Sequence, residues 1–154
     1  MTSGRRSLQF RNFDEINDEV ARLLEGCSTV GSWTLGQICN HLATVTRRIL
    51  NAPVNGPHDT SLRVSEEQRD RVLSTGVLPE GISLPGGLAP PEDMDAREAA
   101  RFLRQTLADF AAAPGPFAPH RLFGTLSRDQ WNRLVCVHCA HHLSFAIPTI
   151  DEAS

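Results

Sequence analysis

Residues 136–145, with the sequence CVHCAHHLSF, contain three of the six histidines and two of the four cysteines of the chain. Imidazole and thiolate groups are typical ligands of zinc and related divalent metals. His138 and His142 are four residues apart, so on a helix their side chains lie one above the other and can share one ion. Two ligands hold a metal only weakly, so a third ligand must come from elsewhere in the chain.

The two histidines share one face of the expected helix with large apolar residues. For a helix that advances about 100° per residue, Trp131, His142 and Phe145 all lie within about 40° of His138. We expect this face to point into the protein, with Trp131 and Phe145 as an apolar wall for a substrate. His141 lies about 60° from His138, near the edge of the same face.

Cys136 and Cys139 have the CxxC spacing of redox proteins and zinc ribbons. The redox motif gains its reactivity at the start of a helix, whereas these residues are expected in mid-helix. A zinc ribbon needs a second CxxC pair, which Cys27 and Cys39 do not supply. The HExxH protease motif is also absent, because Cys139 follows His138 where a glutamate is required. We interpret these cysteines as buried or partly buried structural thiols.

His41 is the candidate third ligand, because it is the only histidine inside another expected helix. If the two helices are neighbours, His41, His138 and His142 can converge on one point. Three neutral imidazoles with an open fourth position are typical of a catalytic metal site and suit Zn²⁺, Ni²⁺ or Fe²⁺. The alternative for each histidine is an ordinary buried imidazole held by hydrogen bonds.

Several polar residues near these histidines are further candidates, each with a structural alternative. Arg48 follows His41 by two turns and could pair with a substrate carboxylate, or it could be a solvated residue at the helix end. Gln37 could hydrogen-bond a metal-bound water or a ligand imidazole, or it could be a buried packing amide. His120, which precedes the last helix, could transfer protons or brace its loop.

Helices must position these residues, and five segments start with a capping signal. Four long helices are expected over residues 12–25, 34–51, 95–112 and from 127 to just before Pro148. The Pro/Gly-rich crossover between the second and third of these contains a short helix over 65–76, and residues 77–95 are expected to form an ordered loop or a lid. No strand shows convincing alternation. The pattern predicts a single all-α domain, residues 1–154, with the architecture of a four-helix bundle.

Composition excludes several function classes. The net charge of −3 gives no electrostatic basis for binding nucleic acid or an anionic membrane. The chain has no lysine and no tyrosine, which excludes a lysine Schiff base and a tyrosine acid. No apolar run approaches the roughly 20 residues of a membrane helix, and no secretory signal is recognisable. We expect a cytoplasmic protein with reduced thiols.

Two blocks, WTLGQICNHL (33–42) and HCAHHLSF (138–145), resemble the DinB-like (YfiT-like) four-helix-bundle metalloproteins. The patterns from Gly31 to Leu42 and from Pro119 to Trp131 are similar to a branch of uncharacterised bacterial proteins, and the similarity extends over nearly the whole chain. The resemblance implies His41, His138 and His142 as metal ligands, with His141 as an extra histidine. This chain has Leu143-Ser144-Phe145 where many members have Arg-Gly-Gln.

The resemblance also implies a chemistry. Relatives include transferases and an isomerase that use a low-molecular-weight thiol such as bacillithiol, mycothiol or glutathione. An open metal site lowers the pKa of a bound thiol and presents a thiolate to a small electrophile. The alternatives are a metal-dependent hydrolase that uses bound water, and a non-catalytic, stress-related binding module. The expected partners are a small-molecule substrate and, for the binding module, a second copy in a homodimer.

Overall fold

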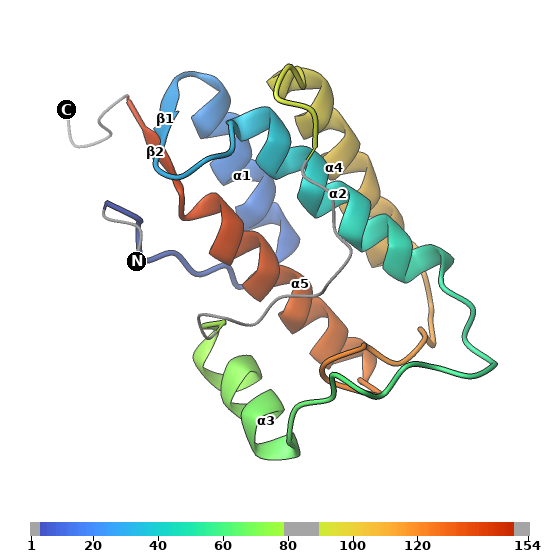
Figure 1. The fold of residues 1–154 in the computed structure, drawn as a ribbon. Coiled ribbons are helices and arrows are strands. Elements are labelled where there is room, and N and C mark those ends of the chain that lie inside the picture. The colour runs from blue at the N-terminus through green and yellow to red at the C-terminus, as the bar shows by residue number, and fades with distance from the viewer. Residues whose placement is uncertain (1–3, 79–89, 150–154) are drawn as a thin grey trace.

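The computed structural model describes residues 4–78 and 90–149. These residues form five helices and one two-stranded sheet, in the order α1 (Phe13–Leu24), β1 (Cys27–Thr29), α2 (Leu35–Asn51), α3 (Glu66–Thr75), α4 (Ala96–Ala112), α5 (Arg128–Leu143) and β2 (Ala146–Pro148). The helices α1, α2, α4 and α5 pack around a common core, while α3 lies apart from them beside α5 (Figure 1). The chain is therefore mostly helical, as predicted.

Side-chain caps start all five helices at the predicted residues. Each cap accepts a hydrogen bond from the backbone N–H three residues later, and the caps are Asn12, Thr34, Ser65, Asp95 and Ser127. At three of them the glutamine at the third helical position returns a bond to the cap backbone, which completes a capping box. These bonds satisfy N–H groups that a helix start otherwise leaves without partners.

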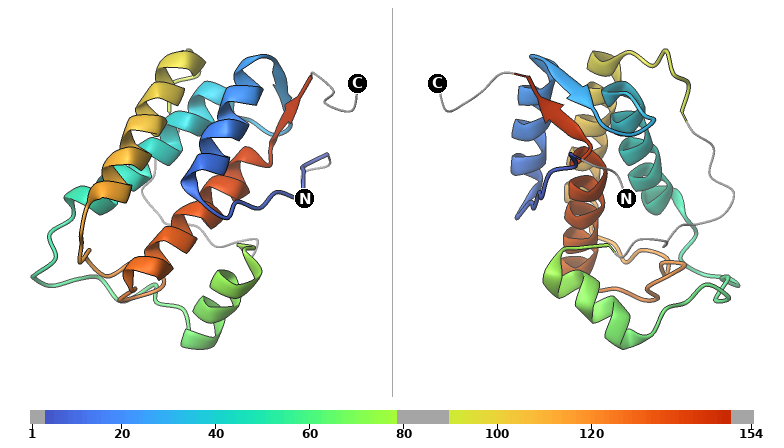
Figure 2. Two further views of the ribbon diagram at one scale, coloured as in Figure 1. Left: turned by 180° about the vertical axis from the view of Figure 1, so that it is seen from behind. Right: turned by 60° about the vertical axis from the view of Figure 1, so that its left-hand side comes forward.

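The two-stranded sheet was not predicted. β1 pairs antiparallel with β2, with Ser28 opposite Ile147, at one end of the long helices (Figures 1 and 2). The last helix therefore ends at Leu143, several residues before the predicted end. Pro148 disfavours helical geometry in the residue before it, and the main chain of 146–148 pairs instead with a strand more than a hundred residues earlier.

The N-terminal turn of α2 lies unusually close to the segment that leads into α4. A Cβ atom added to Gly36 would overlap the carbonyl oxygen of Met94. A hydrogen bond also ties the two segments together, because the Gln37 side-chain amide donates to the carbonyl of Pro90 at 2.7 Å. The missing side chain at Gly36 thus lets the two backbones approach, and this contact fixes the start of α2.

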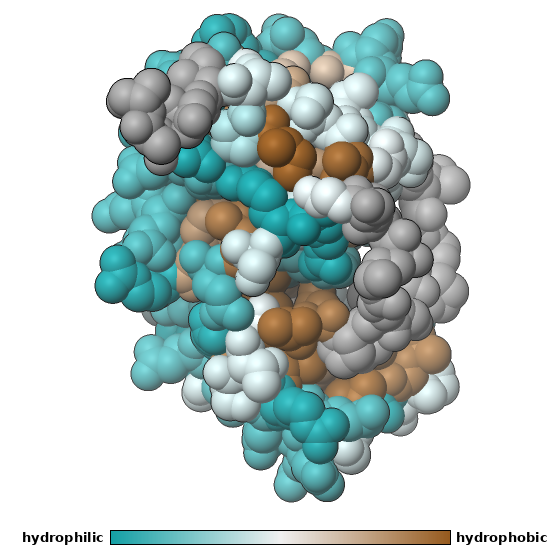
Figure 3. All heavy atoms as spheres, turned by 90° about the vertical axis from the view of Figure 1, so that its left-hand side faces the viewer, coloured by the Kyte–Doolittle hydropathy of each residue, from teal (hydrophilic) through white to brown (hydrophobic). Residues whose placement is uncertain are grey.

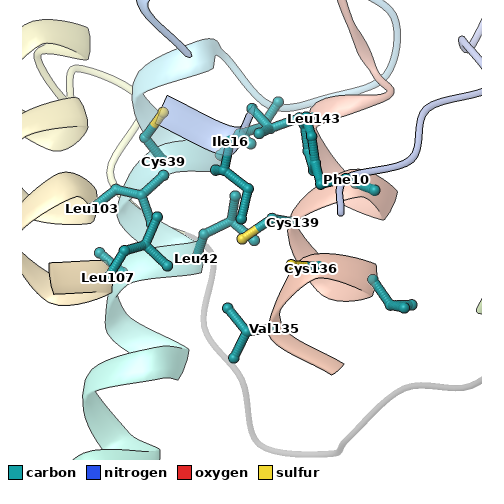
Figure 4. Close-up of a cluster of buried hydrophobic side chains, with 14 of the residues drawn as sticks. Phe10, Ile16, Cys39, Leu42, Leu103, Leu107, Val135, Cys136, Cys139 and Leu143 are labelled. Carbon is teal, nitrogen blue, oxygen red and sulfur yellow. The ribbon is translucent and has the colours of Figure 1, made fainter. Parts of the chain in front are cut away.

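The interior is apolar and includes three of the cysteines. Cys39, Cys136 and Cys139 are buried among leucine and isoleucine side chains (Figure 4). Burial raises the pKa of Cys39 to about 12 and that of Cys136 to about 11. All four cysteines are free thiols. The expected burial of the CxxC pair is confirmed, and it supports the interpretation as structural thiols, since a buried, protonated thiol is a poor nucleophile.

The crossover contains the expected short helix. α3 begins at the predicted cap, and Gly76, with φ of 73°, ends it in the left-handed conformation. The middle of the predicted lid, residues 79–89, lies outside the described residues.

No helix in the described ranges has both the length and the apolar character that crossing a membrane requires.

Candidate metal centre

The structure brings His41, His138 and His142 together into a three-histidine cluster. One ring nitrogen from each residue lies within 4.8 Å of the others. The ring centroid of His41 is 5.3 Å from that of His138 and 4.6 Å from that of His142, and the two α5 rings are 4.7 Å apart. The predicted convergence of α2 and α5 on one point is confirmed.

The orientation of α5 differs from the prediction in one respect. All three imidazoles are half-buried, whereas Cys136 and Cys139 on another side of α5 are buried in the core. The most deeply buried side of this helix is therefore the one with the cysteines, and the histidines lie on a partly accessible side facing α2. This arrangement leaves the imidazoles within reach of a ligand.

The cluster keeps its imidazoles uncharged. Burial lowers the pKa of His138 to about 3, and the neighbouring histidines contribute to that shift. Burial is also the main cause of the lowered pKa of His142 and of His41, to which Arg48 adds a smaller effect at His41. At neutral pH each ring therefore retains a free lone pair, which is the form that binds a metal.

Trp33 covers the cluster and was not predicted as a site residue. Its ring stacks on His142 at 5.8 Å with an interplanar angle of 14°, and it lies 5.0 Å from His41. Trp33 immediately precedes the cap of α2, so helical periodicity assigned it to no face. The available signal was its position next to the cap, where an apolar residue commonly packs back on the helix.

His141 lies beside the cluster and is held by the N-terminal segment. Its Nδ1 is 2.8 Å from a guanidinium nitrogen of Arg5. Because arginine can only donate, Nδ1 is the acceptor, and the proton of the neutral ring is on Nε2. The ring meets His142 edge-on at 4.9 Å. His141 is thus outside the cluster and contacts one member of it, in agreement with its placement at the edge of the face.

Gln37 and Arg48 have different positions relative to the cluster. The Gln37 side chain is buried and is used in the capping box and in the bond to Pro90. This favours a buried packing amide, because the hydrogen bonds of the Gln37 side chain go to Thr34 and Pro90 and not to a histidine. Arg48 is exposed and makes no hydrogen bond or ion pair within residues 4–78 and 90–149. Its charge nevertheless acts on His41.

His120 braces its loop. Its Nδ1 accepts hydrogen bonds from the backbone N–H groups of Leu122 and Phe123, at 3.0 and 3.3 Å. Burial lowers its pKa to about 4, so the ring is neutral with its proton on Nε2. These contacts support the bracing alternative. The proton-transfer role remains a prediction. A positive charge on His120 would lower the pKa of His138.

Trp131 and Phe145 do not form the predicted wall. Trp131 is buried and packs on Phe117 and His120, at 5.9 and 5.7 Å between ring centroids. None of the ring contacts in the described part of the chain joins it to the cluster. Because it is two turns before His138, it shares the face of the histidines but lies too far along the helix axis.

Phe145 lies beyond the end of α5, because the helix stops at Leu143. Its ring lies under the guanidinium of Arg5, with 4.7 Å from Cζ to the ring centroid, and 5.9 Å from His141. The prediction that Phe145 continues the helical face was therefore wrong. The residue instead helps to hold the N-terminal segment.

Viewed from the side of this segment and the sheet, the surface is mostly hydrophilic, with hydrophobic groups exposed between the polar ones (Figure 3).

The donor set of the cluster indicates which ions it could hold. Three nitrogen ligands suit zinc, nickel or iron, whereas calcium and magnesium prefer oxygen ligands. The described residues that form the cluster include no carboxylate or thiol. The cluster could therefore hold one divalent transition metal through His41, His138 and His142.

Comparison with known proteins gives a family. The sequence model of DUF1569, described as a protein of unknown function, matches residues 2–149. The chain therefore belongs to the DUF1569 family. No curated protein matches it, and no solved structure matches it.

Proposed function

We propose that this chain is a metal-dependent enzyme in which His41, His138 and His142 hold one divalent ion, zinc, nickel or iron. The observation that carries the proposal is the convergence of three uncharged imidazoles from two helices within 4.8 Å. A single histidine in a protein interior is commonly held by hydrogen bonds. By contrast, no hydrogen bond described for residues 4–78 and 90–149 uses any ring nitrogen of these three. A metal ion would satisfy all three.

We also propose that the fold is a four-helix bundle of the DinB-like type. The four long helices α1, α2, α4 and α5 share one core, and the short α3 lies in the crossover. One candidate ligand is in the second long helix and two are in the last, which is the arrangement expected from the resemblance. This placement supports the proposed fold and the proposed site together.

The proposed reaction is the transfer or isomerisation of a small electrophile by a low-molecular-weight thiol. A metal at this site would supply a Lewis acid that lowers the pKa of the thiol. The residues of this chain would hold the reactants: the three imidazoles stay neutral, and Trp33 covers two of them and excludes water from that side. His120 could donate a hydrogen bond through Nε2.

Elemental analysis tests the metal site. Wild-type protein purified without chelator and without a polyhistidine tag, then loaded with zinc and desalted, is expected to retain stoichiometric metal. His41→Ala and His138→Ala should each lose it, because two imidazoles are too few for tight binding. His58→Ala is the matched control, since His58 bonds a backbone carbonyl in a distant loop. Undiminished metal in both cluster variants would contradict the assignment.

Thiol dependence tests the reaction class. The metal-loaded protein is mixed with an electrophile such as chlorodinitrobenzene, with and without bacillithiol, mycothiol or glutathione. The proposal expects product only when both thiol and metal are present, and none from His41→Ala. Hydrolysis of an activated ester without thiol would instead favour a hydrolase. Inactivity in both assays, with metal bound, would favour a binding module.

A further inference from the structure

Apart from the neighbouring histidines, the charged groups that act on the histidines of the site are arginines. Arg5 acts on His141 and His142, and Arg48 acts on His41. No aspartate or glutamate acts on any of these rings in the described part of the chain. This is unexpected for a chain with a net charge of −3.

Arg5 is fixed beside the cluster by several contacts. Its Nε donates to the Ser144 hydroxyl at 2.6 Å, and its Nη2 lies 2.8 Å from Nδ1 of His141. The guanidinium lies over the ring of Phe145. The next residue also holds the segment, because the Arg6 N–H donates to the Ser144 carbonyl at 2.8 Å. These contacts place one cation against the ring that touches His142.

The guanidinium of Arg5 retains hydrogen-bonding capacity. It has five N–H donors, and its contacts leave Nη1 without a partner among the described residues. No carboxylate pairs with it in that part of the chain. Because Nε and Nη2 already bond Ser144 and His141, Nη1 is the nitrogen that could donate a charge-assisted hydrogen bond to a ligand carboxylate. Arg5 is therefore a positioned and unneutralised cation.

Arg48 is a second cation, on α2, whose charge acts on His41. It follows His41 by two turns of α2, so the two residues share a face of that helix. It is exposed and makes no ion pair with any described residue. By contrast, its neighbour Arg47 pairs with Asp109 at 2.8 Å. Arg48, which shares a helix face with His41, therefore has no carboxylate partner among the described residues, whereas the adjacent Arg47 has one.

A metal held by three imidazoles would add two positive charges to these surroundings. Neutral ligands leave the charge of the ion uncompensated, and no carboxylate of the described cluster offsets it. Uncompensated charge is costly in a half-buried site, so a ligand with negative charge would complete it more favourably than a neutral one. A neutral ligand would leave the charges of the ion and of the two arginines without a counter-charge.

We propose that the metal centre takes a small anionic substrate bearing a carboxylate, that Arg5 holds the carboxylate, and that the charge of Arg48 adds to the attraction. This inference rests on the proposed metal site and names the class of molecule that the site accepts. Arg5, supplied by the N-terminal segment, is the principal contact, because its guanidinium is already fixed. Arg48 adds the second positive charge.

Two thiols of matched length test the proposal with cobalt-loaded protein. 3-Mercaptopropionate carries a carboxylate and propanethiol does not, while both bind cobalt through sulfur and change its visible absorption. The wild type is expected to bind the carboxylate thiol more tightly. Arg5→Gln should reduce this preference about tenfold, because a hydrogen bond to a charged group is lost. It should leave propanethiol affinity and cobalt content unchanged.

Further variants separate charge from structure. Arg48→Gln should also reduce the preference, and Arg5→Lys should keep part of it because the charge remains. Arg71→Gln is the control, since Arg71 pairs with Glu67 on the surface of α3. Equal affinity for both thiols in the wild type would overturn the proposal. So would a preference that survives the Arg5→Gln, Arg48→Gln double variant, because chelation of the metal would then explain it. A wild type that binds no cobalt contradicts the metal site itself, and the inference with it.

Discussion

At the scale of single residues, Trp33 shows how a side chain outside any helix completes the site. The indole stacks on His142 and meets His41 at an angle, so one ring restrains imidazoles from two helices. A metal ligand binds best when its ring is already oriented, and groups that orient ligands commonly contribute about tenfold or more to metal affinity. Trp33 therefore acts on the metal through the two rings that it touches.

We expect Trp33→Ala to weaken zinc binding about tenfold, because two ligand rings lose the surface that orients them. Trp33→Phe should retain most of the affinity, since phenylalanine can stack on the same imidazole. Competition with a chromophoric chelator measures both values. Circular dichroism of each variant controls for unfolding. Equal affinities in the wild type and in a folded Trp33→Ala variant would show that the indole has no such role.

At the scale of elements, the site depends on how closely α2 approaches the segment before α4. Gly36 and Gln37 form this contact, and His41 lies one turn further along the same helix. A glycine in a helix costs about 1 kcal/mol relative to alanine, so its presence here needs a packing reason. The overlap that a side chain at this position would make with the Met94 carbonyl supplies that reason.

We expect Gly36→Ala to lower the free energy of unfolding by about 1–3 kcal/mol, because the gain in helix propensity is smaller than the cost of overpacking. Asn51→Ala, at the exposed end of α2, is the control and should change stability by less than about 0.5 kcal/mol. Urea denaturation followed by circular dichroism measures both. A Gly36→Ala variant as stable as the wild type would contradict the proposed close contact.

The elements also show which features a sequence can predict. All five helix starts were predictable because a cap and its partner are three residues apart, and this chemistry is local. The histidine spacing on α5 was local for the same reason. His41 could be added because it shares the apolar face of its own helix. Local patterns thus predicted the helices and the candidate ligands.

Features that depend on distant pairing could not be predicted in this way. β2 forms because its backbone finds β1, and that pairing removes Phe145 from the expected helix. Arg5 reaches Ser144 across almost the full length of the chain. Trp131, which was expected at the site, lies away from the cluster because the distance along α5 matters as much as the angle around it, and Trp33, for which no role was predicted, covers the cluster instead. None of these contacts leaves a periodic pattern.

At the scale of the whole molecule, the histidines make stability depend on pH. Burial is the first cause of the lowered pKa of each of His41, His120, His138, His141 and His142. In the unfolded chain a histidine has a pKa of about 6.5. As the pH falls below that value, the unfolded chain takes up protons that the folded, metal-free chain does not. Proton uptake by the unfolded state lowers the free energy of unfolding.

The metal-free protein should therefore lose stability as the pH is lowered from about 7 to about 5, by up to about 1.4 kcal/mol per pH unit for each strongly shifted histidine. Urea midpoints across this range measure the slope. His138→Gln should flatten it, because a glutamine takes up no proton in either state. A slope that is the same in wild type and His138→Gln would contradict the buried, neutral state of that ring.

Saturating zinc at pH 7 should raise the urea midpoint of the wild type and leave that of His138→Gln unchanged, because only the intact folded cluster binds the ion.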